Sequence, residues 1–365
     1  MRYVLLGDAE SPHLLKWARA LSQPALPPSC PLELWVASSR GFAPGFDGLV
    51  PPARRLALAT RPHAAGGNLA VLAQLPKLAR WLKQADAAWI HAHYLTSHGT
   101  LALLAKRVFG VPGRLLGSAW GSDILVAPAH SAVVRALTRR VLTACMLCTS
   151  DSQVMAARMR TLGAAEVMVF PFGLEALPAP PGPKDEALFF ANRGLEPIYA
   201  PERVLALFAS AAPADARLII ANDGSQREAM GLQAEALGVA GRVQFVGRLD
   251  AATQAGWYAR ARWYVSLPRS DSVAVSVLEA MAYGCLPILS DLPANRELVR
   301  HGHNGWLVSA DLLPTVADLH GLKGRLDAIA RANHAWVGHH GLFAPGVQAF
   351  LGRLQALAPE AFGSP

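Results

Sequence analysis

The sequence predicts an α/β protein composed of two Rossmann-like domains. Residues 3–21 read as a buried strand, a glycine turn and a helix, the unit from which doubly wound sheets are built. The same alternation restarts near residue 188, after a proline-rich segment at 178–183. A chain of 365 residues is long enough for two such domains.

The domain limits follow from this alternation and from composition. We expect a first domain at 1–177, a linker at 178–184 and a second domain at 185–335. The linker is predicted because the sequence PAPPGP favours neither helix nor strand. We expect residues 336–365 to form a C-terminal tail that packs back on the first domain.

The composition is typical of a globular cytoplasmic protein. Hydrophobic residues make up 52% of the chain and charged residues 16%, so a large core is expected. No apolar run reaches the roughly 18–20 residues that a membrane-spanning helix needs. The N-terminal sequence RYVLLGD is too short and too soon broken for a signal peptide. Four cysteines are few for this length, which indicates a reducing compartment.

The positive charge lies in the first half of the chain. Residues 1–173 contain 18 Lys and Arg against 8 Asp and Glu, a net charge of +10, whereas the remainder contains 16 against 18. This asymmetry predicts that the first domain meets an anionic partner.

Two predicted helices of the first domain, 75–83 and 131–144, set basic residues against Leu, Val or Trp. The basic residues are Lys77, Arg80, Lys83, Arg135, Arg139 and Arg140. This pattern favours docking on an anionic membrane surface. The alternative is a surface helix packed normally on the sheet.

Two local patterns resemble metal ligands, but neither favours a metal site. Cys145 and Cys148 form a CxxC in an apolar strand, where positions i and i+3 are expected on opposite faces. His91, His93 and His98 are close in the sequence, but no carboxylate accompanies them. We therefore predict core cysteines and no metal.

The most informative stretch is 269–308. Asp271 and Glu279 flank the apolar sequence SVAVSVL, and the pattern from Val277 is helical and ends at Gly284. Asp271 is therefore expected just before a helix N-terminus, whose free N–H groups and dipole favour the binding of phosphate. Carboxylates on both sides suit a ligand that is part phosphate and part polyol, because they accept hydrogen bonds from sugar hydroxyls.

This stretch resembles the acidic-pair signature of family 4 glycosyltransferases, E-x7-E followed by a helix that begins LEAMA-x-G. Asp271 stands for the first acid and Glu279 for the second, at the same spacing. The resemblance implies the GT-B fold, in which two Rossmann-like domains face each other across a cleft. It also implies transfer of a hexose-type sugar from a nucleotide diphosphate sugar, with retention and without a metal.

The resemblance assigns roles in the second domain. Arg193 would stabilise the departing diphosphate, Asp271 would hold sugar hydroxyls and Glu279 the ribose, so these three are the candidate catalytic residues. Other implied donor-binding residues are Gly224, Arg248, Ser272, Val273, Ala274, Val275, Ser276, Val277 and Leu278. Two departures are evident: SVA replaces the usual Gly-Phe-Gly after the first acid, and Tyr199 occupies the region of a second cation.

In the first domain the resemblance rests on the strand end HAHY and on WGSD at 120–123. The implied acceptor or cleft residues are Gly7, His13, His93, Tyr94, Gly121 and Asp123. Trp120 replaces a histidine that the family usually places against the donor sugar.

We therefore predict a glycosyltransferase of cell-surface polysaccharide or lipopolysaccharide synthesis. Its acceptor would be a glycan or a lipid-linked molecule at the inner face of the plasma membrane. The alternatives are a soluble small-molecule acceptor, a degenerate nucleotide-sugar-binding protein, and a nucleotide-sugar epimerase, which would not be expected to carry the acidic pair. Nucleic-acid binding is disfavoured because no aromatic–basic recognition motif accompanies the charge.

Overall fold

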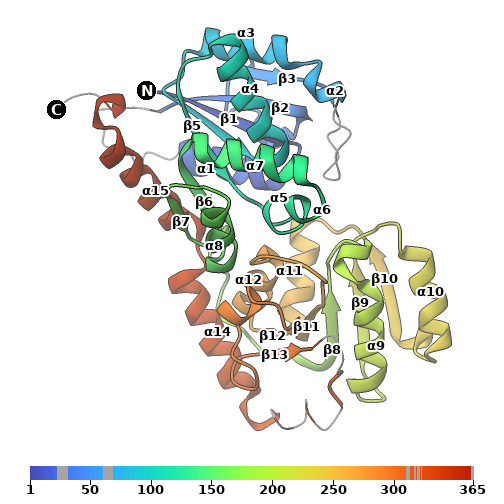
Figure 1. Ribbon diagram of the computed structural model, residues 1–365. Helices are drawn as coiled ribbons and strands as arrows, with labels where there is room; N and C mark the ends of the chain where they lie inside the picture. Colours follow the sequence, from blue (N-terminus) through green and yellow to red (C-terminus); the bar gives the residue numbers. More distant parts are fainter. Residues whose placement is uncertain are drawn as a thin grey trace. The chain divides into compact units, whose positions relative to one another are not determined.

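The structure is a computed structural model that describes residues 1–22, 32–60, 69–309, 313–315, 318, 321 and 323–362. The chain divides into two compact units (Figure 1): unit 1 comprises Met1–Phe170 and Phe343–Pro365, and unit 2 comprises Pro171–Leu342. Each unit contains one parallel sheet flanked by helices. The predicted α/β fold with two Rossmann-like domains is confirmed.

The chain passes between the units at two places. The first lies between Phe170 and Pro171, before the predicted linker, so PAPPGP belongs to unit 2. The second lies between Leu342 and Phe343. The segment that returns to unit 1 is therefore shorter than the tail expected from the sequence.

The sheet of unit 1 has seven parallel strands in the order β3-β2-β1-β4-β5-β6-β7. They are β1 (Arg2–Ala9), β2 (Glu33–Phe42), β3 (Arg55–Ala57), β4 (Trp89–His93), β5 (Arg114–Ser118), β6 (Cys145–Ser150) and β7 (Val167–Val169). All five residues of β4 are buried, as expected for a parallel strand covered on both faces. The chain order reverses between β1 and β4, which makes their carboxyl ends the topological switch point where α/β proteins bind ligands.

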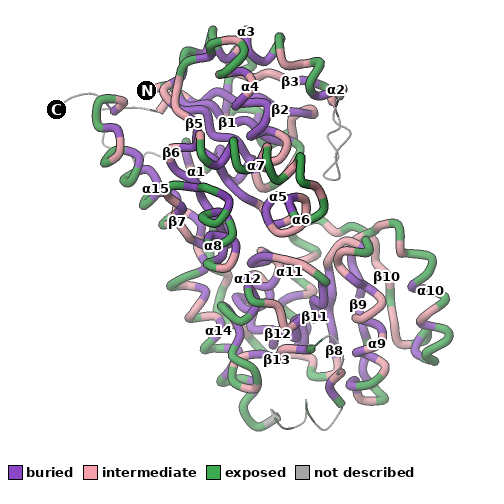
Figure 2. The backbone as a smooth tube through the Cα atoms, viewed as in Figure 1, coloured by how far each residue is buried: buried purple, intermediate pink, exposed green. Residues whose placement is uncertain are grey.

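Helices cover both faces of this sheet, and the strands between them are buried (Figure 2). The helices are α1 (Pro12–Ser22), α2 (Leu69–Leu72), α3 (Leu75–Ala85), α4 (Thr100–Phe109), α5 (Ser122–Leu125), α6 (Ala127–His130), α7 (Ala132–Ala144), α8 (Gln153–Thr161) and α15 (Phe343–Leu357), with a π-helix, η3, at Leu95–Gly99. One face shares a core with α3, α4, α7 and α8. On the other face, Trp17 of α1 packs edge-on against Phe343 and Phe350 of α15, with ring centroids 5.1 and 5.5 Å away.

The sheet of unit 2 has six parallel strands in the order β10-β9-β8-β11-β12-β13. They are β8 (Asp185–Ala191), β9 (Arg217–Ala221), β10 (Val243–Gly247), β11 (Ala261–Ser266), β12 (Leu286–Ser290) and β13 (Trp306–Val308). Here the order reverses between β8 and β11. The carboxyl ends of these two strands form the switch point of unit 2.

Two cores lie on opposite faces of the unit 2 sheet. The main helices are α9 (Pro201–Ala211), α10 (Arg227–Ala236), α11 (Ala251–Arg260), α12 (Val275–Ala282) and α14 (Leu326–His340). α9 and α10 pack on one face, and α11 and α12 pack on the other. α14 contributes Ile329 to the first core and Val337 to the second, so it closes one side of the unit.

The structure corrects the expectation for the CxxC sequence. The pairing of β5 with β6 is irregular between Leu115 and Leu116, and this bulge shifts the alternation of β6. A Cβ added to Gly117 would lie 3.1 Å from Sγ of Cys145 and 3.6 Å from Sγ of Cys148, so both thiols lie on the same face. Both are buried in the core, as predicted. The fourth cysteine, Cys30, lies outside the described residues.

The return of α15 predicts a large effect of truncating Phe350, which is fully buried against Trp17 and His91. Phe350→Ala should lower the free energy of unfolding of unit 1 by about 3–5 kcal/mol, because it opens a cavity in the core. Urea unfolding checks this value. The exposed Gln355 of the same helix is the control, and Gln355→Ala should change stability by less than about 0.5 kcal/mol. Equal effects of the two variants would show that α15 is not part of the core.

Candidate active site in unit 2 and the carboxyl edge of the unit 1 sheet

The switch point of unit 2 holds a partly buried ion pair. Arg193 follows β8 and Asp271 follows β11, and these two strands are neighbours in the sheet. Nη2 of Arg193 lies 2.7 Å from Oδ2 of Asp271, and each side chain is only 19% exposed. The sequence indicated separate roles for these residues, whereas the structure joins them directly.

Three further groups hold this pair in place. The Arg193 guanidinium lies over the ring of Tyr199, with Cζ 4.5 Å from the ring centroid. This is cation–π geometry. Nη1 of Arg193 donates to Oγ of Ser276 at 3.4 Å, and the amide of Ser272 donates to Asp271 at 3.0 Å. Burial raises the pKa of Asp271, and the charge of Arg193 opposes that effect.

The amino end of α12 lies beside this pair. Its N-cap residue, Ala274, has no side chain that could accept a hydrogen bond from the first turn. Several residues predicted to bind the donor have buried side chains: Ser272, Val273, Ala274, Val277 and Leu278. Val275 and Ser276 remain partly exposed.

Glu279 lies one turn further along α12, in a polar network. Its Oε2 accepts hydrogen bonds from the hydroxyl of Tyr258 at 3.0 Å and from Nε2 of Gln254 at 3.3 Å. Tyr258 and Gln254 are four residues apart on α11, so they share one face of that helix. Burial raises the pKa of the Tyr258 phenol well above its usual value, which keeps it a proton donor.

The network continues into the core through Asn192 and Tyr264. Asn192 donates to the Tyr258 hydroxyl at 2.7 Å and accepts from the Tyr264 hydroxyl at 2.8 Å. Sequence reasoning did not assign these residues to the site. The available signal was that Asn192 precedes Arg193 at a strand end, where buried polar groups gather around ligands.

Gly224 and Arg248 follow the two outer strands β9 and β10. A Cβ on Gly224 would lie 2.5 Å from the carbonyl oxygen of Leu195, so only glycine permits this approach of the two loops. Asn222 has a φ of 79°, a left-handed conformation that asparagine tolerates better than most residues. Arg248 is exposed and makes no ion pair with a described residue.

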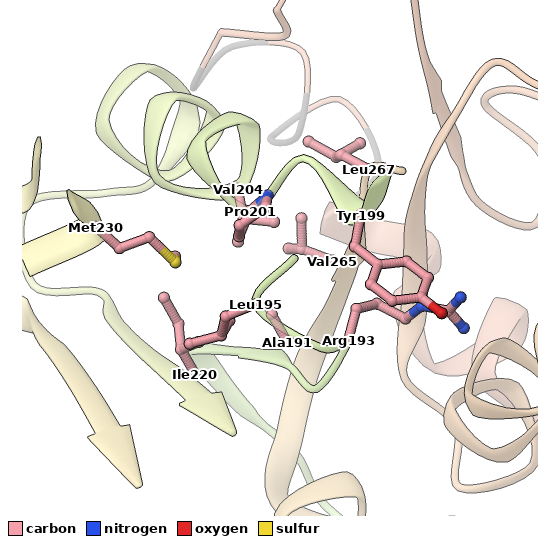
Figure 3. A pocket seen from close by; sticks show the side chains of 10 residues that line it. All are labelled: Ala191, Arg193, Leu195, Tyr199, Pro201, Val204, Ile220, Met230, Val265 and Leu267. Atoms are coloured by element: carbon pink, nitrogen blue, oxygen red, sulfur yellow. The ribbon is translucent and has the colours of Figure 1, made fainter. Parts of the chain in front are cut away.

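Arg193 and Tyr199 line one side of a small pocket (Figure 3). The rest of its lining is apolar and comes from Ala191, Leu195, Pro201, Val204, Ile220, Met230, Val265 and Leu267. Its volume of about 10 Å³ is enough for one water molecule but not for a nucleobase.

In unit 1, the switch point gathers three predicted residues and Trp120. The ring of His13 stacks at a tilt on Trp120 with centroids 4.6 Å apart, and His93 lies 6.0 Å from the same ring. A Cβ on Gly7 would lie 3.2 Å from Cβ of His93, so the close approach of β1 and β4 favours glycine. Together these residues form an aromatic cluster at the carboxyl edge of the sheet.

Asp123 joins two loops of this edge. Its carboxylate accepts hydrogen bonds from the amide of Leu95 at 2.8 Å and from that of Trp120 at 2.9 Å. The side chain is fully buried, so it positions the loops and does not face solvent. Tyr94 hydrogen-bonds Ser122 through its hydroxyl, and Gly121 has a φ of 111° that favours glycine.

Three buried histidines lie behind this edge. His91 is held between the hydroxyls of Tyr3 and Ser118, each 2.7 Å from a ring nitrogen. Burial lowers the pKa of His91 to about 3 and that of His98 to about 4, and it lowers that of His93 well below its usual value. All three are therefore neutral at pH 7. No group of three or more metal-ligating side chains occurs among the residues that the structure describes.

Two families match the sequence. The family described as "Glycosyl transferases group 1" matches residues 173–315, and that described as "Glycosyl transferase 4-like" matches residues 57–152. No curated protein matches the chain significantly by sequence.

Solved structures with a similar fold cover nearly the whole chain. Anabaena HepE in complex with UDP-glucose has a TM-score of 0.74 at 15% identity, over 98% of this chain and 100% of that one. Sucrose-phosphate synthase from Thermosynechococcus elongatus has a TM-score of 0.79 at 15% identity, over 99% and 100%. The lipopolysaccharide outer core galactosyltransferase WaaB has a TM-score of 0.67 at 15% identity, over 96% and 100%.

The buried histidines predict that unit 1 loses stability in acid. Their pKa values in the folded state lie below the unfolded value of about 6.5, so the unfolded state binds protons first as the pH falls. Between pH 7 and 5 each histidine should cost on the order of 2 kcal/mol. Burial raises the pKa of Asp123 to about 6, which opposes this loss in part.

Urea unfolding at both pH values, with hydrogen exchange in β4 to identify unit 1, tests the prediction. His98→Gln should reduce the pH-dependent loss by about 2 kcal/mol. The exposed His340 provides the control, because His340→Gln should leave the pH dependence unchanged. A wild-type stability that is equal at pH 7 and 5 would contradict the neutral, buried state of these rings.

Proposed function

The chain belongs to the group 1 glycosyltransferases, and on this premise we propose that it transfers a hexose-type sugar, with retention, from a nucleotide diphosphate sugar to a glycan or lipid-linked acceptor. One observation carries the proposal. Arg193, the amino end of α12 and the carboxylates of Asp271 and Glu279 gather at the switch point of unit 2. A cation, free amides and two acids suit a ligand that joins a diphosphate to two sugars.

In the proposed donor complex, each part of this site has one task. Arg193 and the first amides of α12 bind the diphosphate, since a guanidinium and a helix amino end both favour phosphate. Glu279, oriented by Tyr258 and Gln254, accepts hydrogen bonds from the ribose hydroxyls. Asp271 accepts hydrogen bonds from the transferred sugar.

Similar structures support a nucleotide-sugar donor. HepE was crystallised with UDP and with UDP-glucose, and WaaB is described as a galactosyltransferase of the lipopolysaccharide outer core. We carry over to this chain the donor class from the first and the acceptor class from the second. Synthesis of a cell-surface polysaccharide or lipopolysaccharide is the proposed setting.

The proposed chemistry follows from where charge develops. The bond between the anomeric carbon and the phosphate oxygen breaks, so positive charge grows on the sugar and negative charge on the diphosphate. Arg193 and the dipole of α12 stabilise the departing diphosphate without a metal ion. With retention, the acceptor hydroxyl attacks from the face that the phosphate leaves, and the departing phosphate oxygen can take its proton.

We assign the acceptor to the aromatic cluster of unit 1. Trp120 and the ring of His13 that stacks on it are partly exposed at the carboxyl edge of the sheet, with the buried His93 behind them, and a sugar ring can pack its C–H groups on such flat ring faces. Burial lowers the pKa of His93, so its ring carries no charge at pH 7. This environment suits a neutral sugar at the accepting end of the acceptor.

For membrane docking, the two basic helices of unit 1 differ. Leu78 and Leu82 of α3 are buried in the core, so its apolar face is not available. On α7, Val133 is 70% exposed, and Arg139 and Arg140 further along the same helix are exposed too. We therefore propose α7 as the docking helix for an anionic leaflet. No described helix is long and apolar enough to cross a membrane.

Donor binding and turnover test the proposed function. In a panel of UDP- and GDP-sugars, at least one should release nucleoside diphosphate in the presence of an acceptor lipid fraction. Glu279→Gln should weaken binding of that nucleotide by about 1.5–3 kcal/mol in titration calorimetry, because it removes a charged hydrogen-bond acceptor. The exposed Glu235 of α10 is the control, and Glu235→Gln should bind as wild type does. Unchanged affinity in Glu279→Gln would exclude Glu279 from the nucleotide site.

Vesicle co-sedimentation tests the docking helix. Binding should require anionic lipid and fall as salt rises. Replacement of both Arg139 and Arg140 by Gln should weaken it about 30-fold, since each basic residue near the leaflet adds about 1 kcal/mol. The control removes equal charge from unit 2, with Arg300 and Arg325 changed to Gln. If the wild-type protein does not bind anionic vesicles at low salt, the acceptor is soluble and the membrane proposal fails.

A further inference from the structure

Arg193 already has an anionic ligand in this structure. Asp271 binds its Nη2 at 2.7 Å, Ser276 accepts from Nη1 at 3.4 Å, and Tyr199 covers one face of the guanidinium. A carboxylate and a phosphate bind a guanidinium in the same fork geometry. Asp271 therefore occupies the position that a phosphate bound to Arg193 would need.

We propose that Asp271 is an internal ligand of the diphosphate subsite, and that the donor's diphosphate displaces it from Arg193. This inference rests on the proposed function, because it concerns the same donor. The displaced carboxylate then turns to the hydroxyls of the transferred sugar. Asp271 is thus both a competitor of the diphosphate and a positioning residue for the sugar.

Displacement of Asp271 by the diphosphate fits the structure better than binding of both to Arg193 at once. The Arg193 side chain is only 19% exposed, Nη1 already donates to Ser276, and Tyr199 covers one face, so little of the guanidinium is left for a second anion. A diphosphate also gains the amides of α12, which a single carboxylate cannot fill. Arg269, two residues before Asp271, does not take the place of Arg193, because it is exposed and paired with Glu202.

The free-energy cost of displacing Asp271 from Arg193 depends on which ligand binds. A buried carboxylate that loses its cation must find new hydrogen-bond donors or pay the full cost of desolvation. A nucleoside diphosphate displaces Asp271 and supplies no donors to it. A nucleotide sugar supplies hydroxyls, so it recovers part of that cost. Asp271 should therefore weaken binding of the free diphosphate more than binding of the whole donor.

Calorimetry on Asp271→Asn tests the inference, with UDP, GDP, pyrophosphate and UDP-glucose as probes. The variant should bind its nucleoside diphosphate roughly tenfold tighter than wild type, because the competing charge is gone. The gain for a nucleotide sugar should be smaller, and the affinity for uridine or guanosine should not change. Adding Arg193→Gln to the variant should abolish the gain.

The control is Asp291, which follows β12 at the same sheet edge and pairs with Arg296 at 2.6 Å. Asp291→Asn removes the same charge and should change these affinities less than twofold. Asp271→Ser provides a second variant should Asp271→Asn fail to fold by circular dichroism, and the same gain is expected.

The outcomes separate this inference from the proposed function. If nucleotides bind wild type and either variant binds them equally or more weakly, Asp271 is no competitor, and the inference fails while the donor site stands. If the variants gain affinity for pyrophosphate but no nucleotide sugar is turned over, the displacement holds and the proposed function fails. If no diphosphate binds wild type or variant, both fail.

Discussion

Parallel pairing of strands is the constraint on which both units depend. In a parallel sheet all carboxyl ends lie at one edge, and the loops that follow them must diverge where the chain order reverses. In unit 2 that reversal lies between β8 and β11, which brings Arg193 and Asp271 within 2.7 Å. In unit 1 it lies between β1 and β4, which brings Gly7 against His93. The same topological feature thus creates both candidate ligand sites.

A satisfied polar network supports the site of unit 2. Buried polar groups are costly unless each finds a partner, and a complete network fixes its members in position. Tyr264, Asn192 and Tyr258 form such a chain, which ends at Glu279. Burial raises the pKa of both phenols, so they stay protonated. They can orient the carboxylate of Glu279, but they cannot act as an anion in its place. Glu279 is thereby presented in one orientation to a ligand.

The two carboxyl edges differ in charge although their topology is alike. That of unit 2 holds an ion pair and a carboxylate, which suits a charged nucleotide. That of unit 1 holds the neutral ring of His93 and Trp120, which suits an uncharged sugar. The basic residues of unit 1 lie instead on exposed helix faces such as that of α7. The carboxyl edge of unit 1 and its basic helix faces are therefore separate surface features.

The sequence alone determined the α/β fold, the order of its main elements and the position of Asp271 before a helix, because hydrophobic period, glycine turns and residue spacing act over short distances. It also led to the prediction that Arg193 is a site residue. It did not reveal that Arg193 pairs with Asp271, or that α15 completes unit 1, since both depend on contacts between distant segments. The shared face of Cys145 and Cys148 was missed for a related reason, because a bulge between two paired strands overrides local alternation.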